Sequence, residues 1–174
     1  GYGQACLSGI AHLSDADIVV FLDGDYSDYP EELTLLVAPL IAETADMVIG
    51  SRTLGERERG ALLPQARFGN WLSTLLIRLI FGVSFTDIGP FRALRCDVLR
   101  RLAMRDRDFG WTVEMQVKAA ALGLRAVEVP VRYRRRIGTS KITGTLGGTF
   151  RAGYKILWTI FRYARYRESD SCVD

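Results

Sequence analysis

The sequence predicts an α/β fold in which a mostly parallel sheet is flanked by helices. Residues 18–22 are five consecutive apolar residues, three of them β-branched, which is typical of a strand buried in a parallel sheet. A helix is expected to follow, with Pro30 suited to its first turn and an apolar face that repeats at helical spacing as far as Ile41. Residues 46–52 form a second short strand. Strand, helix and strand make one βαβ unit, which places the turn after the first strand at the carboxyl edge of the sheet.

Two carboxylates follow the first strand directly. Asp23 and Asp25 are separated only by Gly24. In open α/β sheets, ligands bind beyond the carboxyl ends of the strands. Carboxylates at that place suit a hard divalent cation that keeps open positions for a phosphate-bearing substrate. The same three residues also suit an ordinary polar turn, so a metal site and a simple turn are both open at this point.

The length and composition are those of one domain with a single core. The chain has 174 residues, and 48% of them are apolar. The net charge is only +3, but acidic residues gather before residue 60 and basic residues gather in the last quarter. This asymmetry indicates an anionic partner or surface for the C-terminal part. The basic residues are Arg132, Arg134, Arg135, Arg136, Lys141, Arg151, Lys155, Arg162, Arg165 and Arg167.

The cysteines and the single histidine exclude several kinds of site. Cys6, Cys96 and Cys172 are odd in number and far apart, so they form neither a disulfide framework nor a metal-ligand motif, and a reducing cytosol is expected. His12 is the only histidine, which excludes a histidine-rich metal site. No signal peptide or long apolar span is visible. Because the chain begins at Gly1 without methionine, we expect a processed form or a fragment of a longer protein.

Polar loops separate the remaining helices and strands. Residues 1–11 are expected to be a loop entering a helix, and their glycines allow a backbone or a phosphate to approach closely. Residues 53–64 form a charged segment that suits a solvated loop better than a lid. Residues 65–81 form an apolar helix that packs in the core or lies against a membrane. The other segments are a turn into a strand at 86–94, helices at 97–102 and from 111, an edge strand at 124–132 containing Pro130, and an amphipathic helix at 146–166.

A series of short motifs also runs through the chain. They are Gly1-Tyr2-Gly3 with Gly9, Asp23-Gly24-Asp25 with Pro30-Glu31, Ile49-Gly50-Ser51-Arg52, Asp87 with Gly89-Pro90-Phe91-Arg92, Trp111-Thr112-Val113-Glu114-Met115, Glu128-Val129-Pro130-Val131, and Arg135 with Gly138-Thr139-Ser140-Lys141. In this order they resemble family 2 glycosyltransferases, and most closely the dolichyl- or polyprenyl-phosphate mannosyl- and glucosyltransferases. The resemblance implies a GT-A-like, Rossmann-type fold. The first βα units and their nucleotide-base contacts are lacking, because they precede the glycine-rich segment in the family.

The resemblance implies an inverting transfer of a hexose from a nucleotide-diphosphate sugar to a polyprenyl or dolichyl phosphate. The departing diphosphate develops charge that needs a metal and fixed cations. Asp23 and Asp25 would hold Mg²⁺ or Mn²⁺ on it, and Asp25 would be catalytic. Ser27 would be a further metal contact, at a position where relatives often carry Gln. Gly1 and Gly3, together with Asp23, would bind the donor.

A lipid phosphate is already an anionic nucleophile, so it needs positioning by cations more than a strong base. The resemblance makes Arg92, Arg135 and Lys141 the candidates for this role. The alternative for Arg135 is one solvated charge among several. Glu114 would orient an acceptor, but Lys118 follows it by four residues, and this spacing favours an ion pair within a helix.

Because the expected acceptor is a lipid phosphate, we predict that the protein is a peripheral membrane enzyme at the cytoplasmic face of the membrane. Residues 1–144 would form the partial transferase domain, and residues 145–174 an amphipathic helix and tail. The helix at 146–166 combines a cationic stripe containing Trp158 with aromatic and aliphatic residues beside it, which suits an anionic membrane surface. The competing interpretation is that its apolar face packs on the core and its arginines face water.

Three other functions are open. A haloacid dehalogenase-type phosphotransferase also places Asp-x-Asp after an apolar strand, but the later lysine and second acidic pair of that family are not evident after residue 52. A nucleic-acid-binding module would use the run from Arg132 to Arg136, but no segment resembles such a fold, so we expect no nucleic-acid partner. Finally, a fragment that lacks part of its nucleotide site would retain the fold without turnover.

Overall fold

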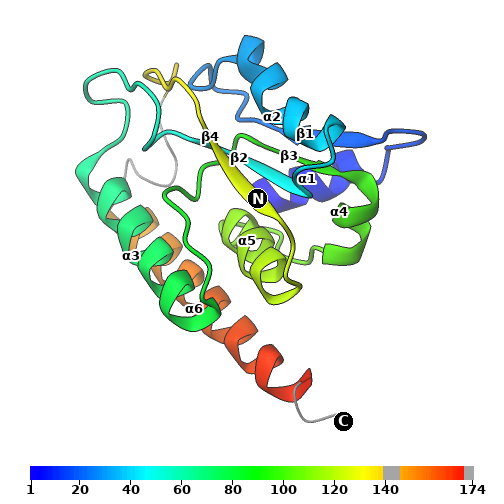
Figure 1. Ribbon diagram of the computed structural model, residues 1–174. Helices are drawn as coiled ribbons and strands as arrows, with labels where there is room; N and C mark the ends of the chain where they lie inside the picture. Colours follow the sequence, from blue (N-terminus) through cyan, green and yellow to red (C-terminus); the bar gives the residue numbers. More distant parts are fainter. Residues whose placement is uncertain (139–145, 171–174) are drawn as a thin grey trace.

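A mixed sheet lies at the centre of the computed structural model, which describes residues 1–138 and 146–170 (Figure 1). Its strands are β1 (Ile18–Phe21), β2 (Met47–Ser51), β3 (Arg92–Arg95) and β4 (Ala126–Pro130), and they lie in the order β1-β3-β2-β4. β3 is antiparallel to both of its neighbours, whereas β2 and β4 are parallel. The predicted α/β fold is confirmed, but the sheet is mixed rather than mostly parallel.

The direction of β3 follows from the long excursion that precedes it. α3 (Pro64–Phe81) carries the chain away from the carboxyl end of β2, and residues 82–91 return to the same end (Figure 1). There the Gly50 N–H donates to the Phe91 carbonyl at 2.8 Å, so the chain re-enters the sheet beside the end of β2 and must run back along it. Because β3 is antiparallel to β1 and to β2, those two strands are parallel to each other. The predicted βαβ unit, formed by β1, α2 and β2, is therefore present, and β3 lies between its two strands in the sheet.

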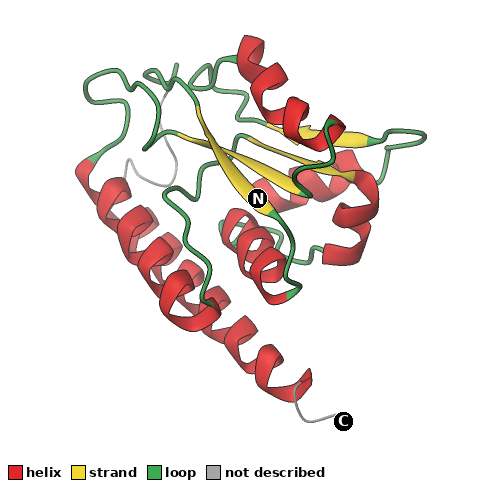
Figure 2. Cartoon of the chain, in the orientation of Figure 1, coloured by secondary structure: helices red, strands yellow, loops and turns green. Residues whose placement is uncertain are grey.

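One face of the sheet is covered by α2 (Leu33–Ile41) (Figure 2). A short 3₁₀ helix over Pro30–Glu32 precedes α2, with the proline in its first turn as predicted. Leu36 and Leu40 are buried against Val48 and Ala93 of the sheet. Because side chains alternate along a strand, the residues next to these two point to the opposite face.

Helices α1 (Tyr2–Ile10), α3, α4 (Cys96–Leu102), α5 (Trp111–Ala121) and α6 (Leu146–Asp170) cover that opposite face (Figure 2). α5 lies in the middle of this layer, and its Trp111 is fully buried in one cluster with Met47 and Leu94 of the sheet. α3 and α6 pack against α5 and against each other. Ile160 of α6 is fully buried in the same cluster, so α6 is part of the core.

Most predicted elements are confirmed. The helices expected at 65–81, at 97–102 and from residue 111 are present, and β4 lies at the edge of the sheet. Residues 1–11 are mainly helix rather than loop. The segment boundary predicted at residue 144 lies outside the described residues. None of the helices in the described ranges is long and apolar enough to cross a membrane.

Candidate functional site

The acidic turn, residues 23–28, lies at the carboxyl end of β1 and is held by its own side chains. Oδ1 of Asp25 accepts hydrogen bonds from the backbone N–H of Ser27 at 3.0 Å and from its hydroxyl at 2.5 Å. Oδ2 of Asp28 accepts one from the Asp23 N–H at 3.0 Å. Tyr26, between them, has a φ of 74°, which is uncommon for a residue other than glycine. The turn therefore holds the two predicted metal-binding carboxylates in place.

A single guanidinium meets both of these carboxylates. Nη2 of Arg136 contacts Oδ2 of Asp25 and lies 3.9 Å from Oδ2 of Asp23. Burial raises the pKa of Asp23, and the neighbouring Asp25 charge raises it further. The two carboxylates repel each other, and both face the same cation. The described residues contain no cluster of three or more His, Cys, Asp or Glu, so a metal here would need further oxygen ligands from a bound phosphate or water.

Ser27 and Asp28 lie beneath the carboxylates. Ser27 is fully buried and its hydroxyl points at Asp25, so its placement favours positioning that carboxylate over the predicted direct metal contact. Asp28 is also buried, and burial raises its pKa to about 6. Its second oxygen, Oδ1, has no hydrogen-bond partner among the described residues.

Residues 132–137, called the arginine strap below, pass beside the acidic turn. The Arg134 N–H donates to the Ser27 carbonyl at 3.0 Å, and the Ile137 N–H donates to the Asp25 carbonyl at 2.9 Å. In an extended segment, alternate side chains point to opposite sides. The even-numbered arginines accordingly reach residues of the acidic turn and the short helix after it: Arg132 pairs with Glu32, Arg134 donates to the Tyr26 carbonyl, and Arg136 contacts Asp25.

The other edge of the strap binds loop 53–64. The Glu58 N–H donates to the Tyr133 carbonyl at 2.9 Å. The Arg135 N–H donates to the Glu58 carboxylate at 2.9 Å, and the Arg135 guanidinium donates to the Arg59 carbonyl at 2.8 Å from Nε and 2.6 Å from Nη2. Arg135, a predicted phosphate ligand, therefore holds the loop. The strap therefore lies between the acidic turn and loop 53–64 and is hydrogen-bonded to both.

A second arginine–carboxylate contact lies beneath this surface. Nε and Nη2 of Arg52 donate to the two oxygens of Asp87 at 2.8 and 2.7 Å, and the Arg52 N–H adds a third bond at 2.7 Å. Burial alone would raise the pKa of Asp87, but the Arg52 guanidinium outweighs it and holds that pKa below its usual value. The Asp87 N–H donates to Glu128 at 3.0 Å, and its carbonyl accepts from Gln116 at 2.9 Å.

The structure places the other predicted phosphate ligands elsewhere. Arg92 is fully buried, and its guanidinium donates to the carbonyls of Gly89 and Thr112. Burial lowers its pKa to about 10. This placement does not favour contact with a phosphate, because a buried guanidinium whose donors face backbone carbonyls cannot meet a ligand without rearrangement. Lys141 lies outside the described residues.

The N-terminal glycines serve packing. A Cβ at Gly3 would lie 2.2 Å from the Asp106 carbonyl oxygen, and a Cβ at Gly1 would lie 2.3 Å from a carboxylate oxygen of Asp108. The Gly3 N–H donates to the Asp108 carbonyl at 3.3 Å. These glycines let α1 approach residues 106–108, and this contact uses the space and the N–H group that a donor phosphate would need. The predicted binding of the donor by Gly1 and Gly3 is therefore not favoured.

The predicted ion pair of Glu114 is confirmed. Oε1 of Glu114 lies 2.7 Å from Nζ of Lys118, and the carboxylate also accepts hydrogen bonds from the Arg105 N–H at 3.0 Å and from the Tyr163 hydroxyl at 2.7 Å. The side chain is almost fully buried. Glu114 therefore joins α5 to α6 and to the segment before α5.

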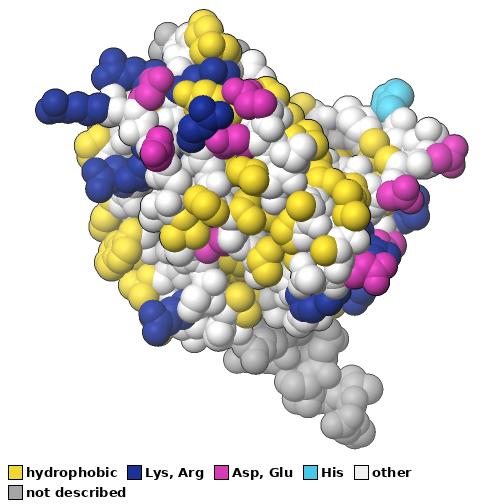
Figure 3. Space-filling model, turned by 45° about the horizontal axis from the view of Figure 1, so that its top comes forward, with side chains coloured by type: hydrophobic (Ala, Val, Ile, Leu, Met, Phe, Trp, Pro, Cys, Tyr) yellow, Lys and Arg dark blue, Asp and Glu magenta, His cyan; other side chains and the backbone are white. Residues whose placement is uncertain are grey.

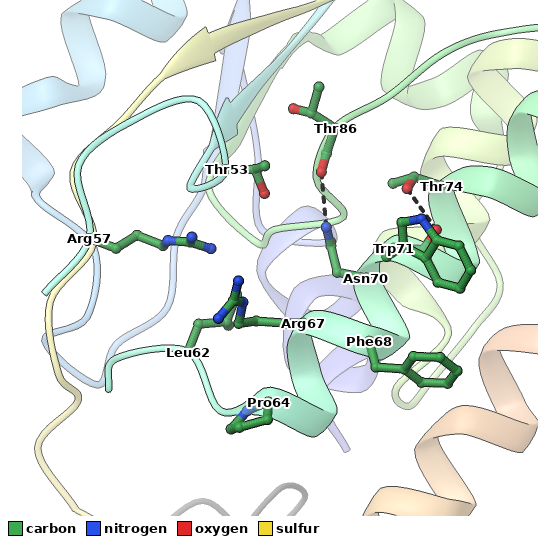
Figure 4. Close-up of a pocket in the computed structure, with 10 residues that line it drawn as sticks. All are labelled: Thr53, Arg57, Leu62, Pro64, Arg67, Phe68, Asn70, Trp71, Thr74 and Thr86. Atoms are coloured by element: carbon green, nitrogen blue, oxygen red, sulfur yellow. Dashed lines mark hydrogen bonds between the residues drawn. The ribbon is translucent and has the colours of Figure 1, made fainter. Parts of the chain in front are cut away.

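A cavity of about 530 Å³ lies between loop 53–64 and the first half of α3 (Figure 4). Arg57 reaches into it from the loop and Arg67 from the helix, while Phe68 and Trp71 lie along one side (Figure 4). We call it the loop cavity. Its lining residues are Thr53, Arg57, Leu62, Pro64, Arg67, Phe68, Asn70, Trp71, Thr74 and Thr86.

Sequence reasoning missed Arg136 and the loop cavity. Arg136 is one of several consecutive arginines, and the only available indication was that positions 132, 134 and 136 share one side of an extended segment. Arg57 and Arg67 both line the cavity because loop 53–64 folds back toward α3. No sequence pattern predicted the conformation of that loop.

Comparison with known proteins shows which proteins this chain resembles. The family described as glycosyl transferase family 2 matches residues 1–103. An undecaprenyl-phosphate mannosyltransferase of Micrococcus luteus is 35% identical over 137 residues, covering 76% of this chain and 56% of that protein. A dolichyl-phosphate hexose transferase of Haloferax volcanii is 30% identical over 149 residues, covering 85% of this chain and 63% of that protein. The chain thus spans less than two thirds of the length of either relative.

Solved structures confirm the predicted GT-A-like fold. Glucosyl-3-phosphoglycerate synthase from Mycobacterium tuberculosis, in complex with phosphoglyceric acid, superposes with a TM-score of 0.66 at 20% identity, over 94% of this chain and 55% of that one. Its complex with Mn²⁺, uridine-diphosphate-glucose and phosphoglyceric acid gives a TM-score of 0.64. At this level of identity the similarity concerns the fold.

Proposed function

Because this chain belongs to glycosyl transferase family 2, we propose that it forms part of an enzyme that moves a hexose from a nucleotide-diphosphate sugar to a polyprenyl phosphate. The names of the Micrococcus luteus and Haloferax volcanii relatives specify undecaprenyl and dolichyl phosphate, which supports this acceptor class. The position of the acidic turn supports a donor that carries a diphosphate. We expect no nucleic-acid partner, because Lys and Arg side chains lie among Asp and Glu side chains on the face shown in Figure 3.

In the proposed reaction, an oxygen of the acceptor phosphate attacks the anomeric carbon opposite the leaving diphosphate and inverts that centre. A phosphate monoester has its second pKa near 6, so it is anionic at neutral pH and needs no general base. Mg²⁺ or Mn²⁺, held by Asp23 and Asp25, would neutralise charge on the leaving diphosphate. Ser27 keeps Asp25 in place through two hydrogen bonds. Arg136 contacts the same carboxylates in the absence of a metal.

The convergence of Asp23 and Asp25 on one cation carries this proposal. The test is Asp25→Asn in the intact protein, because asparagine keeps the size of the side chain but removes the charge that a hard cation requires. We expect metal-dependent transfer to fall by about 100-fold or more. The free energy of unfolding should change little. The matched control is Asp15→Asn, which removes an exposed carboxylate before β1. Turnover near the wild-type value in the Asp25 variant would contradict the assignment.

We also propose that the enzyme works peripherally at the cytoplasmic face of a membrane. α6 exposes Tyr154, Trp158 and Phe161 by 71%, 41% and 53%, whereas Ile160 is fully buried in the core. The guanidinium of Arg162 lies 4.8 Å from the centre of the Trp158 ring. An exposed aromatic face with cations beside it suits a helix that lies at a membrane surface. The opposite face of the same helix packs on the core through Ile160.

Flotation with anionic liposomes tests this membrane position. Each basic residue near an anionic leaflet contributes about 1 kcal/mol, so reversal of Arg151 and Arg162 to Glu should weaken binding roughly tenfold or more at low salt. Lys155 is left unchanged because its Nζ pairs with Asp106 at 2.9 Å. Reversal of Arg100 and Arg101 on α4 makes the same charge change away from α6 and should leave binding nearly unchanged. Binding that is absent at low salt, or indifferent to the α6 reversals, would refute the membrane position.

A further inference from the structure

Arg134 of the arginine strap binds the backbone of the acidic turn at three consecutive residues. Its Nε donates to the Tyr26 carbonyl, and its Nη2 donates to the Asp28 carbonyl at 3.2 Å. Between these two, its backbone N–H donates to the Ser27 carbonyl at 3.0 Å. The guanidinium of Arg134 thus binds carbonyls of the turn and not its carboxylates. These bonds fix the path of the backbone directly after Asp25.

The same guanidinium lies over two aromatic rings. The Cζ atom of Arg134 is 3.3 Å from the centre of the Tyr26 ring and 4.2 Å from the centre of the Tyr29 ring. The guanidinium of Arg132 also lies over the Tyr29 ring, at 4.2 Å. A planar guanidinium can stack on aromatic faces while its N–H groups donate in its plane, whereas the ammonium group of lysine cannot. We call Arg134 and the two rings the tyrosine clamp.

The tyrosine clamp holds a residue with an unfavourable backbone conformation. The φ of Tyr26 is 74°, in the left-handed region that a residue with a Cβ rarely adopts. Tyr26 lies inside the turn that Ser27 closes by donating its N–H and its hydroxyl to Oδ1 of Asp25. Without support a tyrosine favours a negative φ, which would open this turn and turn the Asp25 carboxylate away. Tyr26 is 54% exposed, so the contacts with Arg134 supply this support in place of core packing.

We propose that Arg134 is a positioning residue for metal binding at the acidic turn. Together with the rings of Tyr26 and Tyr29, it holds Tyr26 in the left-handed conformation, and this conformation orients the Asp25 carboxylate before a metal binds. The inference rests on the proposed metal site and adds a residue that acts on it only through the backbone. The effect of Arg134 on metal binding is opposite in sign to that of Arg136, which contacts the carboxylates themselves.

Titration of the intact protein with Mn²⁺ alone, measured by electron paramagnetic resonance, tests the sign of this effect. Removal of a positive charge near a cation site would by itself tighten Mn²⁺ binding. Arg134→Gln should instead weaken it roughly tenfold, because the orientation of a ligand is lost. Arg134→Lys keeps the charge but not the planar group, and should weaken binding about as much. Arg59→Gln removes an exposed charge on loop 53–64 and should leave the affinity unchanged. Arg134 variants that bind Mn²⁺ as tightly as wild type, or more tightly, overturn the proposal.

Substitutions of Tyr26 test whether the backbone conformation is what the clamp supplies. Tyr26→Phe keeps the aromatic ring and should retain the wild-type Mn²⁺ affinity. Tyr26→Leu removes the ring but still disfavours a positive φ, so it should lose about as much affinity as Arg134→Gln. Tyr26→Gly adopts a positive φ without support and should bind Mn²⁺ more tightly than Tyr26→Leu. If the glycine variant binds no more tightly than the leucine variant, the backbone conformation is not the cause and the proposal is wrong.

Amide hydrogen exchange and transfer assays distinguish failure of the clamp from failure of the proposed function. In metal-free protein, Arg134→Lys should speed exchange of the Ser27 N–H, which donates to Asp25. In transfer, the same variant should raise the Mn²⁺ concentration for half-maximal rate and keep kcat at saturating Mn²⁺ near the wild-type value. If sugar is transferred but exchange and Mn²⁺ affinity are indifferent to Arg134, the clamp is wrong and the function stands. If no sugar is transferred but both depend on Arg134, the function is wrong and the clamp stands.

Discussion

Two arginine–carboxylate contacts lie at the same end of the sheet and differ in almost every physical respect. The side chains of Arg52 and Asp87 are 11% and 0% exposed, whereas those of Arg136 and Asp25 are 37% and 22% exposed. Arg52 gives Asp87 two side-chain hydrogen bonds and one from its backbone. Arg136 meets Asp25 through one nitrogen, which also faces Asp23.

The difference separates a structural pair from an exchangeable one. A buried charge that loses its partner is left without compensation, because water cannot replace that partner. An exposed ion pair is only slightly more stable than its two groups separately solvated. Another cation can therefore replace the arginine at a small cost in free energy. Arg52 and Asp87 therefore hold the return segment before β3 to the end of β2. Asp23 and Asp25 remain available to a ligand.

The largest effect is expected from breaking the buried pair. Asp87→Asn leaves the Arg52 guanidinium buried without a carboxylate, which should lower the free energy of unfolding by about 3–5 kcal/mol. Urea denaturation at neutral pH measures this change. Asp25→Asn, which breaks the open contact, should alter the same free energy by about 1 kcal/mol or less. Equal losses in the two variants would remove the distinction between the contacts.

The effect of Asp87→Asn should also depend on pH. The folded-state pKa of Asp87 is lowered, so its charge stabilises the fold at pH values above the ordinary pKa of 3.8 and ceases to do so as pH falls through the lower folded-state value. The deficit of Asp87→Asn relative to wild type should therefore be full at neutral pH and shrink below pH 3.8. Denaturation series at decreasing pH measure it. A deficit that grows as pH falls would contradict the sign of this shift.

Local patterns predicted the elements well because each is encoded by neighbouring residues. The apolar run of β1, the proline at residue 30 and the spacing of α3 each depend on a short stretch of chain. The direction of β3 depends instead on where residues 82–91 carry the chain, which no local pattern records. For this reason the sequence did not predict that the sheet is mixed.

The candidate site divides in the same way. The position of Asp23 and Asp25 at the carboxyl end of β1 could be predicted, because a strand end fixes where the residues after it lie in an α/β sheet. Arg92 was expected to meet a phosphate, but it is fully buried and its guanidinium donates to two backbone carbonyls from other segments. Arg136 was hidden among its neighbours, since a sequence does not say which of several arginines faces the acidic turn.

The smallest effect should come from the open contact. The Arg136 guanidinium competes with a metal for Asp23 and Asp25, so Arg136→Gln should tighten Mn²⁺ binding in the absence of nucleotide. Exposed ion pairs are worth about 0.2–1 kcal/mol, which corresponds to a gain of about fivefold at most. Titration of Mn²⁺, followed by electron paramagnetic resonance, measures it. Arg59→Gln makes the same change in net charge on loop 53–64 and should leave the affinity unchanged. Weaker Mn²⁺ binding in the Arg136 variant would mean that the guanidinium holds the carboxylates ready for the metal and does not compete with it.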